Sequence, residues 1–116
     1  MRLPNHEQAQ IPPEKLSDYL LSLAHPVGHS KAVFFRALGY DETNIEQFAK
    51  DLLGIAQSEE VRDTIQTGYG VKYVIAGKLT APSGQTAAVL TVWIVDDEQT
   101  APRFVTAYPS EEAQES

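Results

Sequence analysis

The fold is decided by residues 69–95, which read YGVKYVIAGKLTAPSGQTAAVLTVWIV. Two runs rich in β-branched and aromatic residues, 69–80 and 85–95, flank Ala81-Pro-Ser-Gly84, whose composition is typical of a turn. This pattern predicts two antiparallel strands joined as a hairpin. A third strand is predicted over residues 102–108, PRFVTAY, and ends before Pro109.

Hydrophobic residues at helical spacing precede the strands. Pro12-Pro13-Glu14 opens a first helix, which His25-Pro26 ends because proline disfavours helical geometry in the residue before it. The core-facing stripe predicted for this helix consists of Leu16, Tyr19, Leu20 and Leu23. We therefore expect those four side chains to be buried.

Two more helices are predicted before the strands begin. The second starts near His29 or Ser30 and ends at Gly39, which suits a left-handed cap. The third follows Thr43-Asn-Ile-Glu46, which resembles a capping box, and continues to about Gln57. The polar segment 58–68 is expected to form a short helix or a loop.

Helices followed by strands indicate an α+β fold. We expect about three N-terminal helices packed on a C-terminal antiparallel meander of three or four strands. Residues 1–110 are expected to form a single globular domain, and residues 111–116 an acidic, disordered tail.

Composition limits the partners of this chain. Its 116 residues include 16 Asp and Glu against 9 Lys and Arg, which gives a net charge of −7. That balance argues against a protein that coats DNA and is compatible with binding a basic partner. The chain has no cysteine and no apolar segment near the roughly 18 residues that a membrane span needs, so we expect a cytoplasmic protein without membrane contact.

The segment His25-Pro-Val-Gly-His-Ser-Lys31 concentrates the chemically versatile residues, and no Asp or Glu occurs from Tyr19 through Tyr40. A helix amino terminus presents unpaired amides and a positive dipole end. The predicted phosphate-binding residues are Gly28, His29, Ser30 and Lys31. His25 or His29 could transfer a proton near neutral pH.

A structural reading of the same segment stays open. In it His25 caps the first helix, His29 lies in water and Lys31 covers its own helix face. The two histidines are four residues apart, but Pro26 and Gly28 lie between them and spoil the helical spacing of a metal site. We therefore expect no metal and no cofactor.

The strands add further candidates. Strict alternation in the third strand separates two sets of side chains: Phe104, Thr106 and Tyr108 on one face, and Arg103, Val105 and Ala107 on the other. On this pattern Arg103 and Tyr108 meet only if a bulge or the strand end intervenes.

The predicted hairpin is also poor in negative charge, because residues 64–95 contain no acid. Lys72 and Lys78 either extend a cationic surface from the second helix or lie on an ordinary solvated face. We expect the aromatic residues Tyr69, Tyr73 and Trp93 to pack against the helices, although an exposed pair could stack on bases.

Several motifs resemble an uncharacterised family of small bacterial domains over nearly the whole chain. They include Leu3-Pro-Asn5, His25-Pro-Val-Gly-x-Ser-Lys-Ala-x-Phe-Phe35, Trp93-Ile94 and Pro102-Arg-Phe-Val-Thr-Ala-Tyr-Pro109. Members of that family look like partners of small barrel-like proteins encoded beside them, which implies a toxin and antitoxin pair. At the level of fold alone, the chain is also similar to the metal-independent bacterial ribonucleases that include barnase, EndoU, colicin nucleases and RelE. That superfamily implies four strands.

The resemblance implies attack of a ribose hydroxyl on the adjacent phosphate. Its catalytic candidates are His25, Lys31, Arg103, Thr106 and Tyr108, whereas His29 stands where the family commonly has a basic residue and is interpreted as a charge substitute. We expect a metal-independent endoribonuclease-like toxin that acts on RNA and is controlled by a small cognate, antitoxin-like protein.

The alternative is a noncatalytic interaction module, namely an antitoxin, immunity or scaffold protein that binds a basic protein partner through its acidic third helix and tail. It predicts one broad anionic surface formed by Asp41, Glu42, Glu46, Asp51, Glu59 and Glu60.

Overall fold

The computed structural model describes residues 1–24, 29–96 and 101–110. Helices precede strands, and four strands form one antiparallel sheet in the order β1-β2-β3-β4, which confirms the α+β prediction. The helical elements are η1 (His6–Gln8), α1 (Pro13–Lys15), η2 (Leu16–Leu20), α2 (His29–Ala37) and α3 (Ile45–Ser58). The strands are β1 (Asp63–Gln66), β2 (Gly70–Thr80), β3 (Thr86–Asp96) and β4 (Arg103–Pro109).

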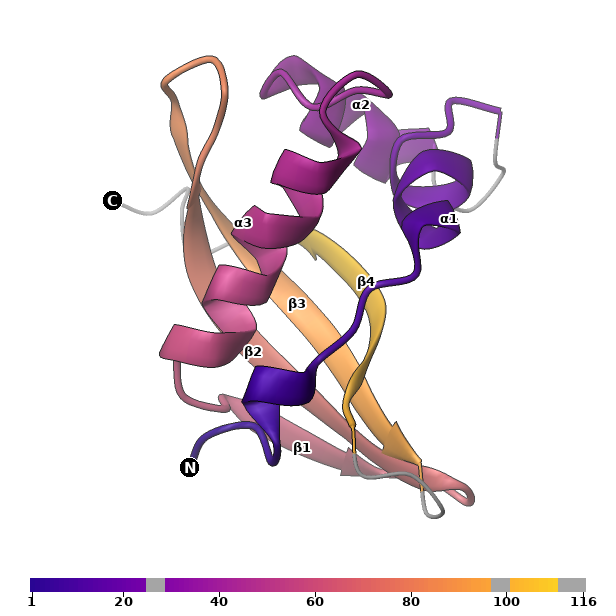
Figure 1. Cartoon of the computed structure of the whole chain (residues 1–116), viewed down its shortest axis with the longest axis vertical. Coiled ribbons are helices and arrows are strands. Elements are labelled where there is room, and N and C mark those ends of the chain that lie inside the picture. The colour runs from indigo at the N-terminus through magenta and orange to yellow at the C-terminus, as the bar shows by residue number, and fades with distance from the viewer. Residues whose placement is uncertain (25–28, 97–100, 111–116) are drawn as a thin grey trace.

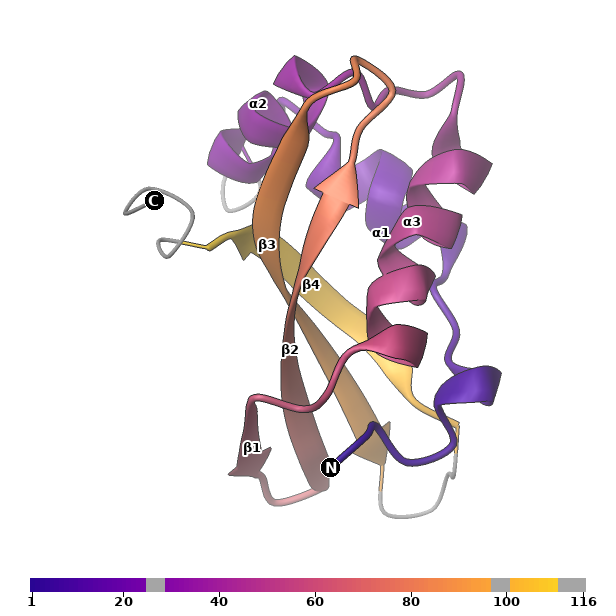
Figure 2. The ribbon, with the colours of Figure 1, turned by 90° about the vertical axis from the view of Figure 1, so that its left-hand side faces the viewer.

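Helix α3 lies across one face of the sheet, and α2 lies beyond the end of β4 (Figures 1 and 2). The core between these layers is aromatic. Trp93 is completely buried and meets Phe104 edge-on, with ring centroids 5.2 Å apart. On the helical side the Phe48 ring lies 4.3 Å from that of Tyr40 and 5.0 Å from that of Phe35. The prediction that Trp93 packs against the helices is confirmed, whereas Tyr69 is exposed.

The central hairpin is confirmed. β2 and β3 pair over their full length, from Gly70 opposite Asp96 to Thr80 opposite Thr86. The turn between them uses Gly84 at a φ of 90°, where a side chain would be strained. Gly39 likewise has a φ of 104° after α2, as expected for a left-handed cap.

The first helix differs from the predicted one. After α1 the chain widens into the π-helical segment η2, in which the amide of Leu21 donates to the carbonyl of Leu16 at 2.8 Å. A π turn holds more residues than an α turn and therefore rotates the side chains that follow. Leu16 and Leu20 are buried as predicted, but Leu21 takes the core position expected of Leu23. Tyr19 is only half-buried, so the predicted stripe is wrong at two of its four positions.

The capping box predicted before α3 is absent. The N-cap is Asn44, and it makes no capping side-chain bond. The amide of Thr43 donates to the carboxylate of Asp41 at 2.8 Å, and the Asn44 side-chain oxygen accepts from the Asp41 amide. A local turn therefore occupies the groups that a capping box would use.

Strand β1 lies in the segment predicted to be a short helix or a loop. All four of its residues are exposed, so it lacks the alternation by which a half-buried strand is recognised. Among the described residues its pairing is with Val71–Val74 of β2, and it completes the four strands that the ribonuclease resemblance implied.

Strand β4 contains a bulge that breaks the predicted alternation. Trp93 is opposite Phe104 and Val92 is opposite Thr106, which leaves Val105 as the extra residue. Phe104 and Thr106 therefore lie on opposite faces of the sheet, contrary to the prediction. Thr106 and Tyr108 instead share their face with Arg103.

Three sequence predictions fall outside the described residues: those for His25, for Gly28 and for the acidic tail 111–116. Within the described ranges, no helix combines the length and the apolarity needed to cross a membrane.

Candidate functional site

A lysine held by two hydroxyl groups is the centre of the candidate site. The Nζ of Lys31 donates to the Oη of Tyr19 at 2.6 Å and to the Oγ1 of Thr106 at 3.0 Å. The two hydroxyl oxygens are themselves 3.2 Å apart. With Lys15 and Tyr108 beside them, these residues form what we call the Lys31 cluster.

Local irregularities position this cluster. Lys31 comes from the first turn of α2. Tyr19 comes from η2, whose π geometry places its ring at the edge of the core. The bulge in β4 directs Thr106 and Tyr108 away from the face that carries Phe104. The structural reading in which Lys31 covers its own helix face is therefore wrong, because its ammonium crosses to β4.

The Lys31 cluster carries positive charge. Lys31 Nζ lies 5.1 Å from the centroid of the Tyr19 ring and 5.9 Å from that of Tyr108. Lys15 Nζ lies 5.6 Å from the Tyr19 ring and donates to the carbonyl of Val105 at 3.4 Å. In the part of the chain that the structure describes, no carboxylate forms a salt bridge with either lysine.

These two lysines change the acidity of Tyr19. Burial is the largest single influence and would raise the pKa of Tyr19. The hydrogen bonds from Lys31 and Thr106, together with the charges of Lys31 and Lys15, outweigh it, so the pKa of Tyr19 is lowered. The phenol can therefore release its proton more readily than an ordinary tyrosine.

The arrangement suits an anionic oxygen. A lysine ammonium has three N–H bonds, and two of those of Lys31 go to Tyr19 and Thr106. Tyr19, Lys31, Thr106 and Tyr108 are all partly exposed, so a ligand can reach them. The cluster thus combines a cation, a hydroxyl and an acidified phenol within hydrogen-bond distance of one another.

The predicted phosphate-binding turn is described only in part. His29 and Ser30 are exposed at the start of α2. The Nδ1 of His29 lies 2.8 Å from the carbonyl of Leu23, so this ring contacts the end of the first helical segment. Among the residues described, no three His, Asp or Glu side chains gather in a way that could hold a metal ion.

Arg103 lies apart from the Lys31 cluster. Its guanidinium contacts Asp96 at 3.1 Å, at the start of β4, whereas Tyr108 lies near the other end of that strand. The bulge puts Arg103 on the same sheet face as Thr106 and Tyr108 but does not bring it to Lys31.

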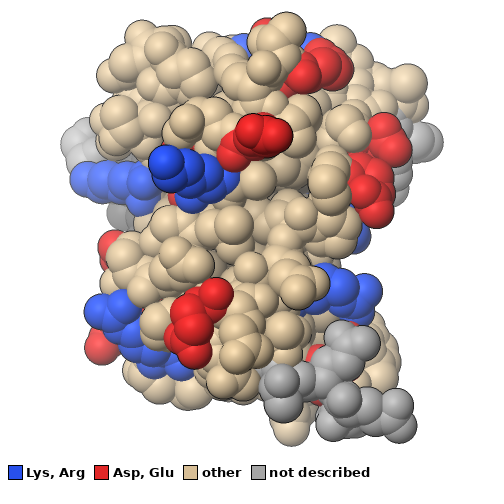
Figure 3. Space-filling view, in the orientation of Figure 1, with Lys and Arg blue, Asp and Glu red and all other residues tan. Residues whose placement is uncertain are grey.

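The acidic residues do not form the single surface that the interaction hypothesis predicted on the face shown in Figure 3, where Asp and Glu are interspersed with Lys and Arg. Individual acids have local partners. Glu42 is ion-paired with Arg36, and Asp51 accepts a hydrogen bond from Tyr40.

Sequence reasoning missed Tyr19 and Lys15 as site residues. Tyr19 fitted the apolar stripe of the first helix, and Lys15 was given no role. The usable signal was the acid-free run, which begins at Tyr19 itself.

The structure defines a small α+β protein with a helical layer on a four-stranded antiparallel sheet and a basic, hydroxyl-rich cluster at the α2–β4 junction. A solved structure with this fold is the contact-dependent growth inhibition toxin–immunity protein complex from Klebsiella pneumoniae 342. The TM-score is 0.71 at 18% sequence identity, over 91% of this chain and 97% of that one, so the likeness concerns the fold.

The chain belongs to the family described as a domain of unknown function (DUF6883), whose model matches residues 2–111. This match confirms the resemblance to an uncharacterised family. The comparison with curated proteins gave no significant match.

Proposed function

We propose that this protein is a metal-independent endoribonuclease-like toxin of a toxin–antitoxin pair and that the Lys31 cluster is its reactive site. The observation that carries the proposal is the Lys31 ammonium, which is held by the Tyr19 and Thr106 hydroxyls and has no carboxylate partner within the described residues. The chain has a net charge of −7, yet the stretch from Tyr19 to Tyr40, which supplies both Tyr19 and Lys31, contains no Asp or Glu. The fold shared with a chain of a toxin–immunity complex supports a role in a pair of this kind, as either member.

RNA cleavage of this kind needs no external nucleophile. The ribose 2′-oxygen attacks the adjacent phosphorus, a base removes the 2′-hydroxyl proton, and the bond from phosphorus to the 5′-oxygen breaks. An acid protonates that leaving oxygen, so the products are a 2′,3′-cyclic phosphate and a 5′-hydroxyl.

The cluster offers groups for these roles. Lys31 and Thr106 would donate to a nonbridging phosphate oxygen and stabilise the charge that develops there. Tyr19, with its lowered pKa, would transfer one proton. For the other we retain His25, a candidate from the sequence that lies outside the described residues. Tyr108 would flank the phosphate. Arg103 is ion-paired with Asp96 and is given no role in the reaction.

The test is a cleavage assay on total RNA and on a single-stranded RNA oligonucleotide, with a chelator present. We expect products with cyclic phosphate ends, and no cleavage of a 2′-O-methylated oligonucleotide. Lys31→Met should lower the rate by about 10²–10³-fold, and Tyr19→Phe by about 10²-fold or more. Lys72→Met, on β2, is the matched control and should keep full activity.

All variants must retain the wild-type circular dichroism spectrum. Absence of cleavage by the folded wild-type protein, or equal rates for the wild type and Lys31→Met, would remove the proposal.

A noncatalytic antitoxin, immunity or scaffold role is the second candidate, because the similar structure contains a toxin and an immunity protein, which have opposite roles. Expression of the chain alone separates the two. Growth arrest that Lys31→Met abolishes supports the toxin, whereas harmless expression of a folded wild-type protein supports the binding module.

A further inference from the structure

Strand β2 has an outer edge that is only half covered. β1 pairs with Val71–Val74, although β2 continues to Thr80. Within the described ranges no strand pairs with the outer edge over Ala76–Thr80. We call this segment the free β2 edge.

The backbone of the free β2 edge presents hydrogen-bonding groups outward. The carbonyl of Val74 accepts from the amide of Arg62, on the β1 side, at 2.8 Å. In an antiparallel strand the N–H and C=O of one residue point to the same neighbour and alternate along the chain. The amides and carbonyls of Ala76 and Lys78 therefore point away from β3 and are available to another strand.

The opposite edge of the sheet, formed by β4, is partly covered by the N-terminal segment. Alongside β4, the amide of Gln10 donates to the carbonyl of Pro102 at 3.0 Å, and Phe104 donates back to Gln10 at 2.9 Å. Lys15 then donates to the carbonyl of Val105 at 3.4 Å. An uncovered edge can pair with another chain. On this side of the sheet the described residues leave two such stretches, the outer side of the four-residue strand β1 and the free β2 edge.

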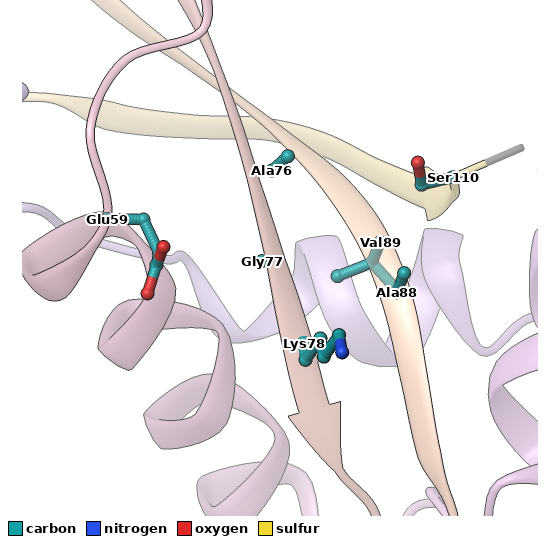
Figure 4. Close-up of a pocket in the computed structure, with 7 residues that line it drawn as sticks. All are labelled: Glu59, Ala76, Gly77, Lys78, Ala88, Val89 and Ser110. Carbon is teal, nitrogen blue, oxygen red and sulfur yellow. The ribbon is translucent and has the colours of Figure 1, made fainter. Parts of the chain in front are cut away.

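Space for an added strand exists on both sides of the free β2 edge. A hollow of about 390 Å³ is lined by Glu59, Ala76 and Lys78 (Figure 4). A second, of about 380 Å³, lies between α3 and β2 and includes Gly54, Glu59 and Lys78. At Gly54 no atom lies within 4 Å of the place a Cβ would take. The alternating side chains of an extended peptide would enter these two hollows in turn.

The two hollows carry mixed charge, because Glu59 and Lys78 line both of them, so the occupant is distinguished by the residue that would lie directly across from Lys78 in an added strand. Lys78 is exposed and forms no salt bridge within the described residues. A second copy of the chain, paired antiparallel about Lys78, would set two lysines directly opposite each other, which is destabilising. An acidic side chain at that position would be attracted instead.

We propose that the free β2 edge binds an extended segment of a different protein as an added strand, with an acidic side chain opposite Lys78. This inference concerns a surface away from the Lys31 cluster and does not depend on whether that cluster cleaves RNA.

The probe is a phage-displayed random peptide library selected on the full chain. Enriched peptides should carry Asp or Glu within an alternating pattern. One such peptide, once synthesised, should slow hydrogen exchange of the Ala76 and Lys78 amides by about tenfold or more at saturation. Lys78→Glu should weaken its binding by about fivefold, and selection on that variant should enrich Lys or Arg. Lys72→Glu, where β1 covers the edge, is the matched control.

N-methylation of the peptide tests backbone pairing without altering the protein. Methyl groups on one set of alternate amides should abolish binding, and those on the other set should not. Failure to enrich any peptide, unchanged exchange at both amides, or a charge preference that survives Lys78→Glu would overturn the proposal. Dimerisation of the chain with these amides protected would assign the edge to a second copy instead.

Discussion

Replacement of Gly77 by alanine tests the contact that seats α3 on the sheet. A Cβ at this position would lie 2.7 and 2.8 Å from two side-chain carbons of Ile55, well inside the roughly 3.5–4.0 Å of a favourable carbon contact. Ile55 is buried in the core, and the two close carbons, Cγ2 and Cγ1, are bonded to its own Cβ, so relief of the contact requires the whole side chain to shift. We expect Gly77→Ala to lower the free energy of unfolding by about 1–2 kcal/mol.

A double-mutant cycle isolates the clash. Ile55→Ala alone should cost about 2–4 kcal/mol, because it leaves a cavity beneath α3. In the double variant the new methyl group occupies part of that cavity and meets no isoleucine. The double variant should therefore lose about 1–2 kcal/mol less than the sum of the single variants.

The assay is urea-induced unfolding followed by the fluorescence of Trp93, which is completely buried in the native state. Gly54→Ala is the matched control, since nothing lies within 4 Å of its added Cβ. It should stabilise α3 by about 0.5–1 kcal/mol and combine additively with Ile55→Ala. Additivity of Gly77→Ala with Ile55→Ala within about 0.5 kcal/mol would refute the packing described here.

Two tyrosines give further predictions. Lys31→Met should raise the pKa of Tyr19, since burial then acts without the opposing ammonium. NMR titration of the tyrosine rings measures this shift, and an unchanged pKa would contradict the cluster geometry. Because folding lowers the pKa of Tyr19, the interaction of its ionised phenolate with Lys31 stabilises the folded state. This stabilisation is fully present above the ordinary tyrosine pKa of about 10 and is lost as pH falls through the native pKa of Tyr19. Tyr40→Phe removes the 2.6 Å hydrogen bond to Asp51 and should cost about 1–2 kcal/mol in urea unfolding at neutral pH. Burial, followed by the bond to Asp51 and its charge, raises the pKa of Tyr40. The stabilisation by the protonated Tyr40 hydroxyl is therefore complete below about pH 10 and is lost as pH rises toward the raised native pKa. If the stability difference between the wild type and Tyr40→Phe stayed constant up to high pH, the assigned hydrogen bond to Asp51 would be refuted.

Most of the fold was predictable from local patterns. The hairpin followed from two apolar runs around Ala81–Gly84, and α3 followed from its helical periodicity, because both signals depend on residues close in sequence. Strand β1 was missed because its exposed residues lack any alternation. It forms because the outer edge of β2 offers partners to Asp63–Gln66, which is a long-range effect.

The candidate site was predictable only in part. Lys31, Thr106 and Tyr108 were named from the sequence, and the structure brings them together. Arg103 was named as well, but it forms an ion pair with Asp96 away from these residues. Tyr19 was assigned to the core, because its spacing from Leu16 is that of an α-helical stripe and gives no sign of a π turn.

The sequence by itself determined the order of helices and strands, the central hairpin and the acid-free run around Lys31, since periodicity, turn residues and charge are local properties. The tertiary structure alone decided the π turn that moves Tyr19 to the edge of the core and the bulge that directs Thr106 toward Lys31. Both irregularities insert one residue into a regular element, and such an insertion is fixed by packing between elements. The hydroxyl-bound lysine therefore exists only in the folded chain.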